Sequence, residues 1–168
     1  MSKINIFCFG FGQVAEGFIN KLIQEKKDFD LSITSRQETH QIELNNFKIT
    51  SYHFTDDKFD RSINKKLKEA NYILISIPPI EGKDIVAKYF DKNLQGITNC
   101  KWITYLSATS VYGDHKGEWV NENSTTKPTS PNGSSRLAAE NTWKKISNKH
   151  KYPLQIFRLA GIYSKEFN

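Results

Sequence analysis

Two hydrophobic periods alternate along the chain. Short continuous apolar runs, typical of buried strands, are separated by segments whose apolar residues recur every three or four positions, as on one face of a helix. The pattern predicts six strands, at 3–9, 30–35, about 47–54, 71–77, 101–107 and 154–159. It predicts helices at 13–26, over Phe59, Ile63 and Leu67, at about 82–91 and at about 134–149.

Strands that alternate with helices predict a parallel sheet covered by helices on both faces. The chain has 168 residues, which is enough for one domain with a full core. We therefore expect residues 1–168 to form a single α/β domain with a doubly wound parallel sheet. Residues 108–131 form an irregular stretch of 24 residues. Because most connections are much shorter, this stretch is a candidate functional loop.

A glycine-rich turn joins the first expected strand to the first expected helix. The turn consists of Gly10, Phe11, Gly12, Gln13, Val14 and Ala15. Gly10 permits a tight turn, Gly12 lets a pyrophosphate approach the backbone, and Ala15 lets the helix pack near the strand. The helix N-terminus then offers free N–H groups to the phosphates. The turn predicts dinucleotide binding in a Rossmann fold, and the alternative is a plain tight turn.

The end of the second expected strand indicates which dinucleotide is bound. An acidic residue there would accept hydrogen bonds from the ribose 2′-hydroxyl of NAD, but the chain has Ser35 and Arg36 instead. A guanidinium and a hydroxyl suit the 2′-phosphate of NADP, so we expect NADP to be preferred over NAD. The alternative is an arginine that is simply exposed. Residues at the ends of later strands are also expected to contact the cofactor: Ile77, Pro78, Pro79 and Ser107.

Three later segments resemble a known family. LSATSVYGDHKGEWVNE at 106–122, PNGSSRLAAE at 131–140 and FRLAGIY at 157–163 are similar to motifs of the extended and atypical short-chain dehydrogenases/reductases. These form the NAD(P)-dependent epimerase/dehydratase family, which includes nucleotide-sugar epimerases. With the glycine turn, the resemblance covers nearly the whole chain in the expected order.

The resemblance implies hydride transfer assisted by a tyrosine acid/base, a lysine and a serine or threonine. The matching positions here hold Asn132, Arg136 and Ala108, which become the candidate catalytic positions. Asn132 cannot exchange a proton, whereas Arg136 can still hold ribose hydroxyls and so is also a candidate cofactor ligand. Tyr105, Tyr112 and His115 are alternative acids, for which structural or exposed roles are favoured.

Two functions follow from the resemblance. An active protein would transfer hydride to or from a hydroxyl or ketone of a sugar-like or nucleotide-linked small molecule. The alternative is a non-catalytic NADP-binding sensor or scaffold. Relatives in the family continue into a C-terminal substrate-binding part, which is expected to be largely absent here because the chain ends at Asn168. The last strand would then be an exposed edge, which favours a homo-oligomer or pairing with another chain.

Composition and charge bear on whether the protein binds nucleic acid, a membrane or a metal. The net charge of +6 suggests nucleic acid, but the lysines are scattered over separate expected helices, which favours a solvated surface. We expect no nucleic acid, no membrane and no metal, because no apolar run is long enough to span a bilayer and no ligand cluster is visible. Cys8 and Cys100 are expected to be buried, reduced thiols. Together these features favour a cytoplasmic protein.

Overall fold

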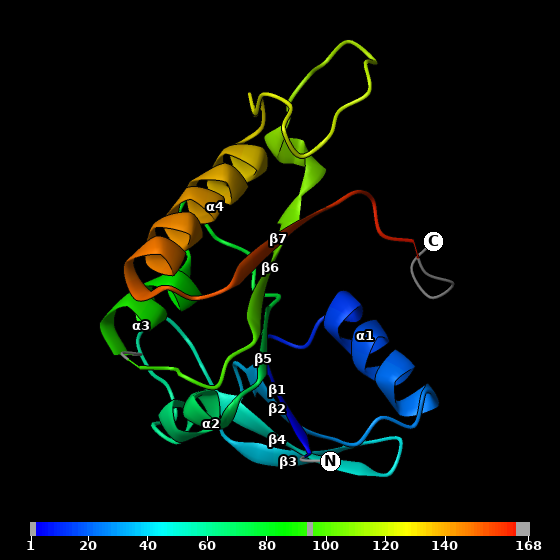
Figure 1. The fold of residues 1–168 in the computed structure, drawn as a ribbon, viewed down its shortest axis with the longest axis vertical. Coiled ribbons are helices and arrows are strands. Elements are labelled where there is room, and N and C mark those ends of the chain that lie inside the picture. Colours follow the sequence, from blue (N-terminus) through cyan, green and yellow to red (C-terminus); the bar gives the residue numbers. More distant parts are fainter. Residues whose placement is uncertain (1–2, 94–95, 164–168) are drawn as a thin grey trace.

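A sheet of seven strands forms the middle layer of the protein (Figure 1). The computed structural model describes residues 3–93 and 96–163. The strands are β1 (Ile4–Phe9), β2 (Phe29–Ser35), β3 (His40–Leu44), β4 (Phe47–His53), β5 (Tyr72–Ile75), β6 (Trp102–Ala108) and β7 (Leu154–Leu159). Their order across the sheet is β3-β4-β2-β1-β5-β6-β7, and every neighbouring pair is parallel except β3 with β4. The doubly wound α/β fold is confirmed.

The expectation of six strands was wrong by one strand, β3. It forms a hairpin with β4 at the edge of the sheet, in antiparallel register from His40 opposite Ser51 to Leu44 opposite Phe47. Asn45 and Asn46 make the turn, with φ angles of 49° and 66°. Asparagine tolerates this left-handed region, and a two-residue turn of this kind matches the twist of the strands that it joins.

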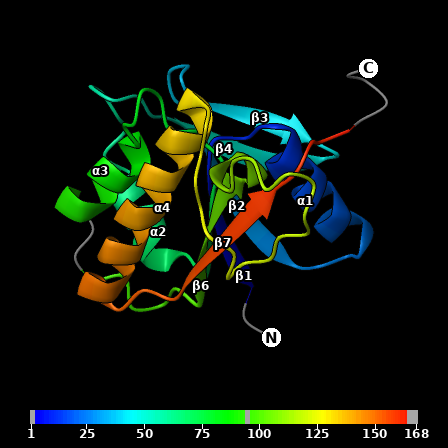
Figure 2. The same ribbon diagram turned by 90° about the horizontal axis from the view of Figure 1, so that it is seen from above.

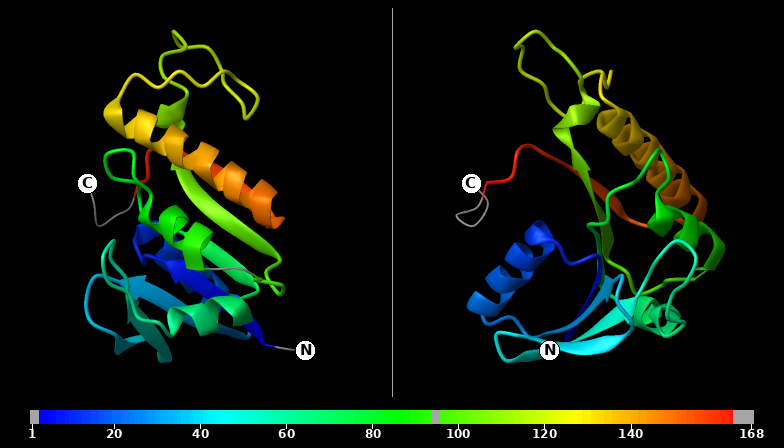
Figure 3. Two further views of the ribbon diagram at one scale, coloured as in Figure 1. Left: turned by 90° about the vertical axis from the view of Figure 1, so that its left-hand side faces the viewer. Right: turned by 180° about the vertical axis from the view of Figure 1, so that it is seen from behind.

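Four helices cover the two faces of the sheet unequally. They are α1 (Gln13–Gln24), α2 (Ile63–Glu69), α3 (Ile85–Asn93) and α4 (Pro131–His150). The expectation that Phe59 belongs to the second helix was wrong, because Phe59 precedes α2 and forms an isolated bridge with Phe54. Helix α1 lies on one face, and α2, α3 and α4 lie on the other (Figures 2 and 3). Each face has its own core: Ala15 and Ile19 of α1 pack in one, and Leu67 of α2, Phe90 of α3 and Trp143 of α4 pack in the other.

Helix α4 begins at Pro131, three residues earlier than the expected start at 134, so the irregular stretch ends at Ser130. The Ser130 side chain caps the helix by accepting a hydrogen bond from the Gly133 N–H at 3.1 Å, and Pro131 occupies the first helical position. A Cβ atom at Gly133 would meet the carbonyl oxygen of Ser110. The glycine therefore lets α4 pack against the short 3-10 turn η1 (Thr109–Val111), which follows β6.

Strand β7 lies at the other edge of the sheet and pairs with β6 alone. The expected exposed edge is therefore present among the residues described, and self-association through it stays a prediction. Both cysteines are free, as expected, but Cys100 is partly exposed rather than buried. Within the described ranges, no helix is long and apolar enough to cross a membrane. The cytoplasmic location stays a prediction.

Candidate functional site

Two adjoining cavities open at the carboxyl edge of the sheet. Strand β1 lies between β2 and β5. From β2 the sheet continues to β4 and β3 at one edge, and from β5 it continues to β6 and β7 at the other. Because the strand order reverses at β1, the ends of β1 and β5 flank a crevice. The larger cavity has a volume of about 630 Å³, and the smaller has a volume of about 280 Å³. Gly12, Ser76 and Pro78 line both. We call them the glycine-turn cavity and the Arg136 cavity.

The glycine-turn cavity is built from the ends of β1, β2, β4 and β5 and from the segment before α3. Its lining comprises Gly10, Phe11, Gly12, Thr34, Ser35, Arg36, Phe54, Thr55, Asp56, Ser76, Ile77, Pro78, Ile80 and Ile85. Seven of the residues expected to bind the cofactor therefore meet in one place. The sequence did not indicate the residues that follow β4, because they become neighbours of the glycine turn only when β4 pairs with β2.

The glycine turn has the backbone that the sequence predicts. Gly10 has a φ of +78°, and a Cβ atom there would lie 2.9 Å from Cγ1 of Ile77. The Gly10 N–H donates a hydrogen bond to Oγ1 of Thr34 at 2.8 Å, so β2 holds the turn in place. Gly12 precedes α1, and no side chain caps the helix. The N–H groups of its first turn are therefore free to bind an anion.

Ser35 and Arg36 lie at the end of β2, on the wall of the glycine-turn cavity. The Ser35 hydroxyl accepts a hydrogen bond from the Ser51 hydroxyl at 3.0 Å, and Arg36 is exposed. Asp56 also lines this cavity, but its carboxylate is paired with Lys88 at 2.5 Å. Arg36 makes no ion pair within the part of the chain that the structure describes, so its charge is available to a ligand.

The Arg136 cavity brings together α1, α4 and the ends of β5, β6 and β7. Its lining comprises Gly12, Gln13, Val14, Ser76, Pro78, Leu106, Ser107, Ala108, Arg136, Leu159, Ala160 and Ile162. Arg136 donates a hydrogen bond from Nη1 to the Leu106 carbonyl oxygen at 2.6 Å. Its Nε is buried and makes no hydrogen bond to any described residue. Ala108 contributes only a methyl group to this wall.

The Ser107 hydroxyl is bound to α4. It donates a hydrogen bond at 2.6 Å to Oε1 of Glu140, a carboxylate with 0% exposure. Arg158 of β7 donates to the same carboxylate from Nε at 3.0 Å and from Nη2 at 2.8 Å. The Arg158 guanidinium also lies 4.7 Å from the centre of the Tyr112 ring. The Ser107 hydroxyl, one residue before the candidate catalytic position Ala108, is therefore part of a buried network.

The Glu140 carboxyl stays ionised in this network. Burial alone would raise its pKa, but the hydrogen bonds from Arg158 and Ser107 outweigh burial and hold the pKa below its usual value. The same pairing raises the pKa of Arg158. The network therefore holds charge rather than a transferable proton.

Other expected site residues lie elsewhere. Asn132 is exposed in the first turn of α4 and lines neither cavity, so the three candidate catalytic positions do not share a wall. Ala15 is buried on the inner face of α1 and Pro79 is buried beside Pro78, and neither lines a cavity. The Tyr105 ring packs against Trp143, and burial raises the pKa of its hydroxyl.

Of the other two alternative acids, Tyr112 packs its ring against the Arg158 guanidinium, and His115 lies in the loop after η1, with Nε2 at 3.1 Å from the Thr125 carbonyl oxygen. That loop projects beyond the sheet at the top of Figure 1. In the described part of the chain, no group of three or more His, Cys, Asp or Glu side chains could hold a metal ion.

Comparison with known proteins finds nucleotide-sugar epimerases. No model of a known protein family matches the sequence. The curated UDP-glucose 4-epimerase of Lacticaseibacillus casei is 27% identical over 142 residues, which are 77% of this chain and 40% of that protein. A solved conserved protein of unknown function from Silicibacter pomeroyi is 28% identical, with a TM-score of 0.73 over 94% of this chain and 52% of its own.

A UDP-glucuronic acid 4-epimerase of Bacillus cereus, solved in complex with NAD, has a TM-score of 0.68 at 16% identity. It matches 94% of this chain and 57% of its own. This chain thus spans 40% of the curated relative and little more than half of the two solved proteins. The similarities show that it shares the Rossmann fold of nucleotide-sugar epimerases.

Proposed function

We propose that the two cavities bind a nicotinamide adenine dinucleotide, with its pyrophosphate at the glycine turn. The observation that supports this most strongly is the uncapped start of α1 directly after Gly10 and Gly12, beside the point where the strand order reverses. A Cβ atom at Gly10 would crowd Ile77, so the turn is kept narrow by the absence of a side chain. Bound there, the cofactor supplies the capacity for hydride transfer.

The proposed cofactor is NADP in preference to NAD. Arg36 and Ser35 offer a guanidinium and a hydroxyl at the end of β2, where the 2′-phosphate would lie. The carboxylate of Asp56, which also lines this cavity, is already paired with Lys88. Arg136 is proposed to hold the ribose next to the nicotinamide through guanidinium nitrogens that Leu106 does not occupy.

Cofactor titration of the Arg36→Ala variant tests this preference. We expect the Kd for NADPH to rise by about tenfold, the loss of one charge-assisted contact, and the Kd for NADH to change little. Tryptophan fluorescence of the protein can follow both titrations. The matched control is Arg61→Ala, which removes an exposed arginine outside both cavities and should change neither constant. Equal weakening of both cofactors would remove the argument for NADP, and no saturable response to either would refute the dinucleotide site.

The proposed family is the epimerase/dehydratase branch of the short-chain dehydrogenases/reductases. Its support is the sequence similarity to the Lacticaseibacillus casei enzyme and the ordered motifs from the glycine turn to β7. In an active protein, hydride would pass between the nicotinamide and a hydroxyl or ketone of a sugar-like or nucleotide-linked substrate. Arg136 and the backbone at Ala108 would then orient the cofactor and substrate.

A second candidate function is a non-catalytic NADP-binding sensor or scaffold. Three features favour it: Ala108 has no hydroxyl, the Ser107 hydroxyl is held by Glu140, and Asn132 is exposed outside both cavities. A side chain that could exchange a proton with a substrate at neutral pH is not among the described residues that line the Arg136 cavity. A non-catalytic NADP-binding protein therefore explains these residues of the Arg136 cavity better than an enzyme does.

Cofactor turnover separates the two candidates. NADPH oxidation is measured by absorbance with a panel of nucleotide-linked 4-keto sugars, on the full chain and on the Arg136→Ala variant. For a sensor or scaffold we expect saturable NADPH binding without turnover above the buffer rate. Steady turnover that Arg136→Ala abolishes would establish the enzyme instead. The control is the Arg61→Ala variant, which should behave like the unmodified protein.

A further inference from the structure

The backbone of Arg36 is held on both sides by the end of β4. On one side, the Phe54 N–H donates a hydrogen bond to the Ser35 carbonyl oxygen at 2.9 Å. On the other side, Nδ1 of His53 lies 3.0 Å from the Gln37 carbonyl oxygen. A carbonyl oxygen can only accept a hydrogen bond, so Nδ1 carries a proton and is the donor. Arg36 thus lies between two carbonyl groups that are both fixed to β4 or to the residue after it.

His53 takes part in further contacts with the residues that follow Arg36. Its backbone N–H donates to Oγ1 of Thr39 at 3.1 Å, and the Thr39 hydroxyl donates to Oδ2 of Asp60 at 2.6 Å. The Asp60 N–H in turn donates to the His53 carbonyl oxygen at 2.9 Å. The His53 side chain is 8% exposed, whereas Arg36 and Thr39 are exposed. A buried residue therefore anchors the exposed residues 36–39, which we call the Arg36 segment.

The carboxylates of this region have partners other than Arg36. Glu38 pairs with Lys58 at 2.7 Å. Asp57 and Asp60 accept hydrogen bonds from hydroxyl groups at 2.8 Å and 2.6 Å. In a segment that was free to move, one of these carboxylates could pair with the Arg36 guanidinium and neutralise it. The contacts of the Arg36 segment therefore keep the guanidinium charge available at the end of β2.

We propose that His53 is a positioning residue for NADP, which acts through the Gln37 carbonyl oxygen on Arg36. This role depends on the proposed NADP site. His53 itself is not among the described residues that line the glycine-turn cavity, whereas Arg36 is. The imidazole holds the Arg36 segment in place before the cofactor binds, so less conformational entropy is lost when the guanidinium meets the 2′-phosphate. NADH has a hydroxyl in place of that phosphate, so its affinity does not depend on the imidazole.

Fluorescence titrations of His53→Leu and His53→Asn with NADPH and NADH test the proposal. Leucine fills much of the space of the imidazole without a donor, whereas the asparagine amide nitrogen can take the place of Nδ1. We expect His53→Leu to raise the Kd for NADPH about fivefold, the loss of one hydrogen bond, and to leave the Kd for NADH unchanged. His53→Asn should retain the affinity for NADPH. The control His115→Leu removes an imidazole–carbonyl contact from a loop outside both cavities and should change neither Kd.

The double variant Arg36→Ala/His53→Leu shows whether the histidine acts through the arginine. We expect its Kd for NADPH to equal that of Arg36→Ala alone, because both changes remove the same interaction with the phosphate. Further weakening in the double variant would overturn the proposal. Equal weakening of NADPH and NADH by His53→Leu would also overturn it, because a purely structural role predicts that result.

Circular dichroism melts check that each variant is folded. If His53→Leu does not fold, Thr39→Val takes its place, because the Thr39 hydroxyl holds the same segment to the His53 N–H. Thr39→Val should weaken NADPH alone, and Thr39→Ser should not. Selective weakening of NADPH by Arg36→Ala, but not by His53→Leu or Thr39→Val, would refute the role of His53 and leave the proposed NADP site standing. An Arg36→Ala variant without a selective effect would refute both.

Discussion

At the scale of single residues, Glu140 is a buried carboxylate that several neighbouring side chains hold in place. It is completely buried, yet it is charged and is held by Ser107, by Nε and Nη2 on one edge of the Arg158 guanidinium and, at 4.0 Å, by Lys144. Such a pair adds little stability when complete, because burial of both charges costs nearly as much as their attraction gains. Removing one partner is different, because the other charge stays buried without compensation.

The Glu140→Gln variant should therefore lose about 3–5 kcal/mol of unfolding free energy at neutral pH, measured by urea denaturation. Glu140 has a pKa below the ordinary 4.5, so its contribution is present above that pH and is lost as the pH falls through the lower, folded value. The difference between the two proteins should shrink in that acidic range. The control Glu118→Gln changes an exposed loop carboxylate and should cost almost nothing. A difference that is small at neutral pH would mean that the Arg158 charge is solvated.

Residue identities reveal only part of the proposed cofactor site. Gly10, Gly12 and Arg36 are recognisable in the sequence because a turn, a close approach and a charge each require a particular residue type. Thr34 is not recognisable, since many buried strand positions hold threonine, and its hydrogen bond to Gly10 exists only when β2 lies beside β1. Ser107 could be recognised as a candidate, but not the carboxylate that binds it.

At the scale of elements, the β3–β4 hairpin depends on the turn at Asn45 and Asn46. Both residues have positive φ angles, a conformation that is open to glycine and tolerated by asparagine but strained for a β-branched residue. The strands on either side pair over five positions, so the turn sets the register of the edge of the sheet.

Replacing Asn46 should therefore shift stability in opposite directions. We expect Asn46→Gly to keep or slightly raise the unfolding temperature, and Asn46→Val to cost about 1–3 kcal/mol, measured by urea denaturation. The Lys48→Val variant is the matched control, because it places the same side chain at an exposed position within β4. If both valine variants behaved alike, the turn would not constrain the hairpin.

The ends of a helix or strand can be predicted from the sequence where a capping residue or a proline marks them. The start of α4 can be read from Ser130 and Pro131, a capping residue and a residue suited to the first helical position, although apolar periodicity alone places it later. Strand β3 has a weak signal, because HQIEL alternates around one isoleucine and one leucine only, and its pairing with β4 rather than its own sequence makes it a strand.

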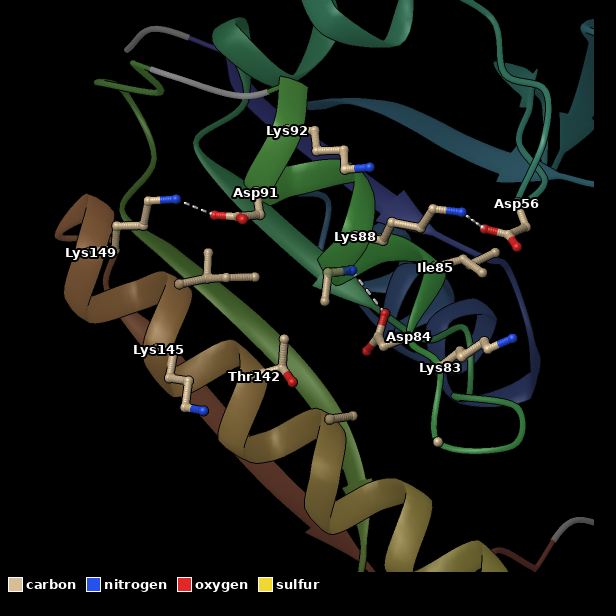
Figure 4. Close-up of a pocket in the computed structure, with 14 residues that line it drawn as sticks. Asp56, Lys83, Asp84, Ile85, Lys88, Asp91, Lys92, Thr142, Lys145 and Lys149 are labelled. Carbon is tan, nitrogen blue, oxygen red and sulfur yellow. Dashed lines mark hydrogen bonds and ion pairs between the residues drawn. The ribbon is translucent and has the colours of Figure 1, made fainter.

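At the scale of the whole molecule, the lysines have a distribution that no segment of sequence displays. Lys83, Lys88 and Lys92 precede or belong to α3, and Lys145 and Lys149 belong to α4, about fifty residues later. Packing of the two helices on one face of the sheet turns these scattered charges into the walls of one groove of about 640 Å³ (Figure 4). Asp56 and Ile85 line both this groove and the glycine-turn cavity, so the groove and that cavity share a wall.

The sequence by itself determined the α/β fold and the glycine turn at the start of α1. It also predicted that Asn132, Arg136 and Ala108 stand where the family that it resembles has a tyrosine, a lysine and a serine or threonine. These depend on local rules: hydrophobic period, backbone freedom and residue chemistry at one position. Only the tertiary structure decided that the Ser107 hydroxyl belongs to Glu140, that Asn132 lies outside both cavities and that lysines gather between α3 and α4. Those facts depend on which segments strand pairing and helix packing bring together, and contacts between distant segments leave no pattern in a single sequence.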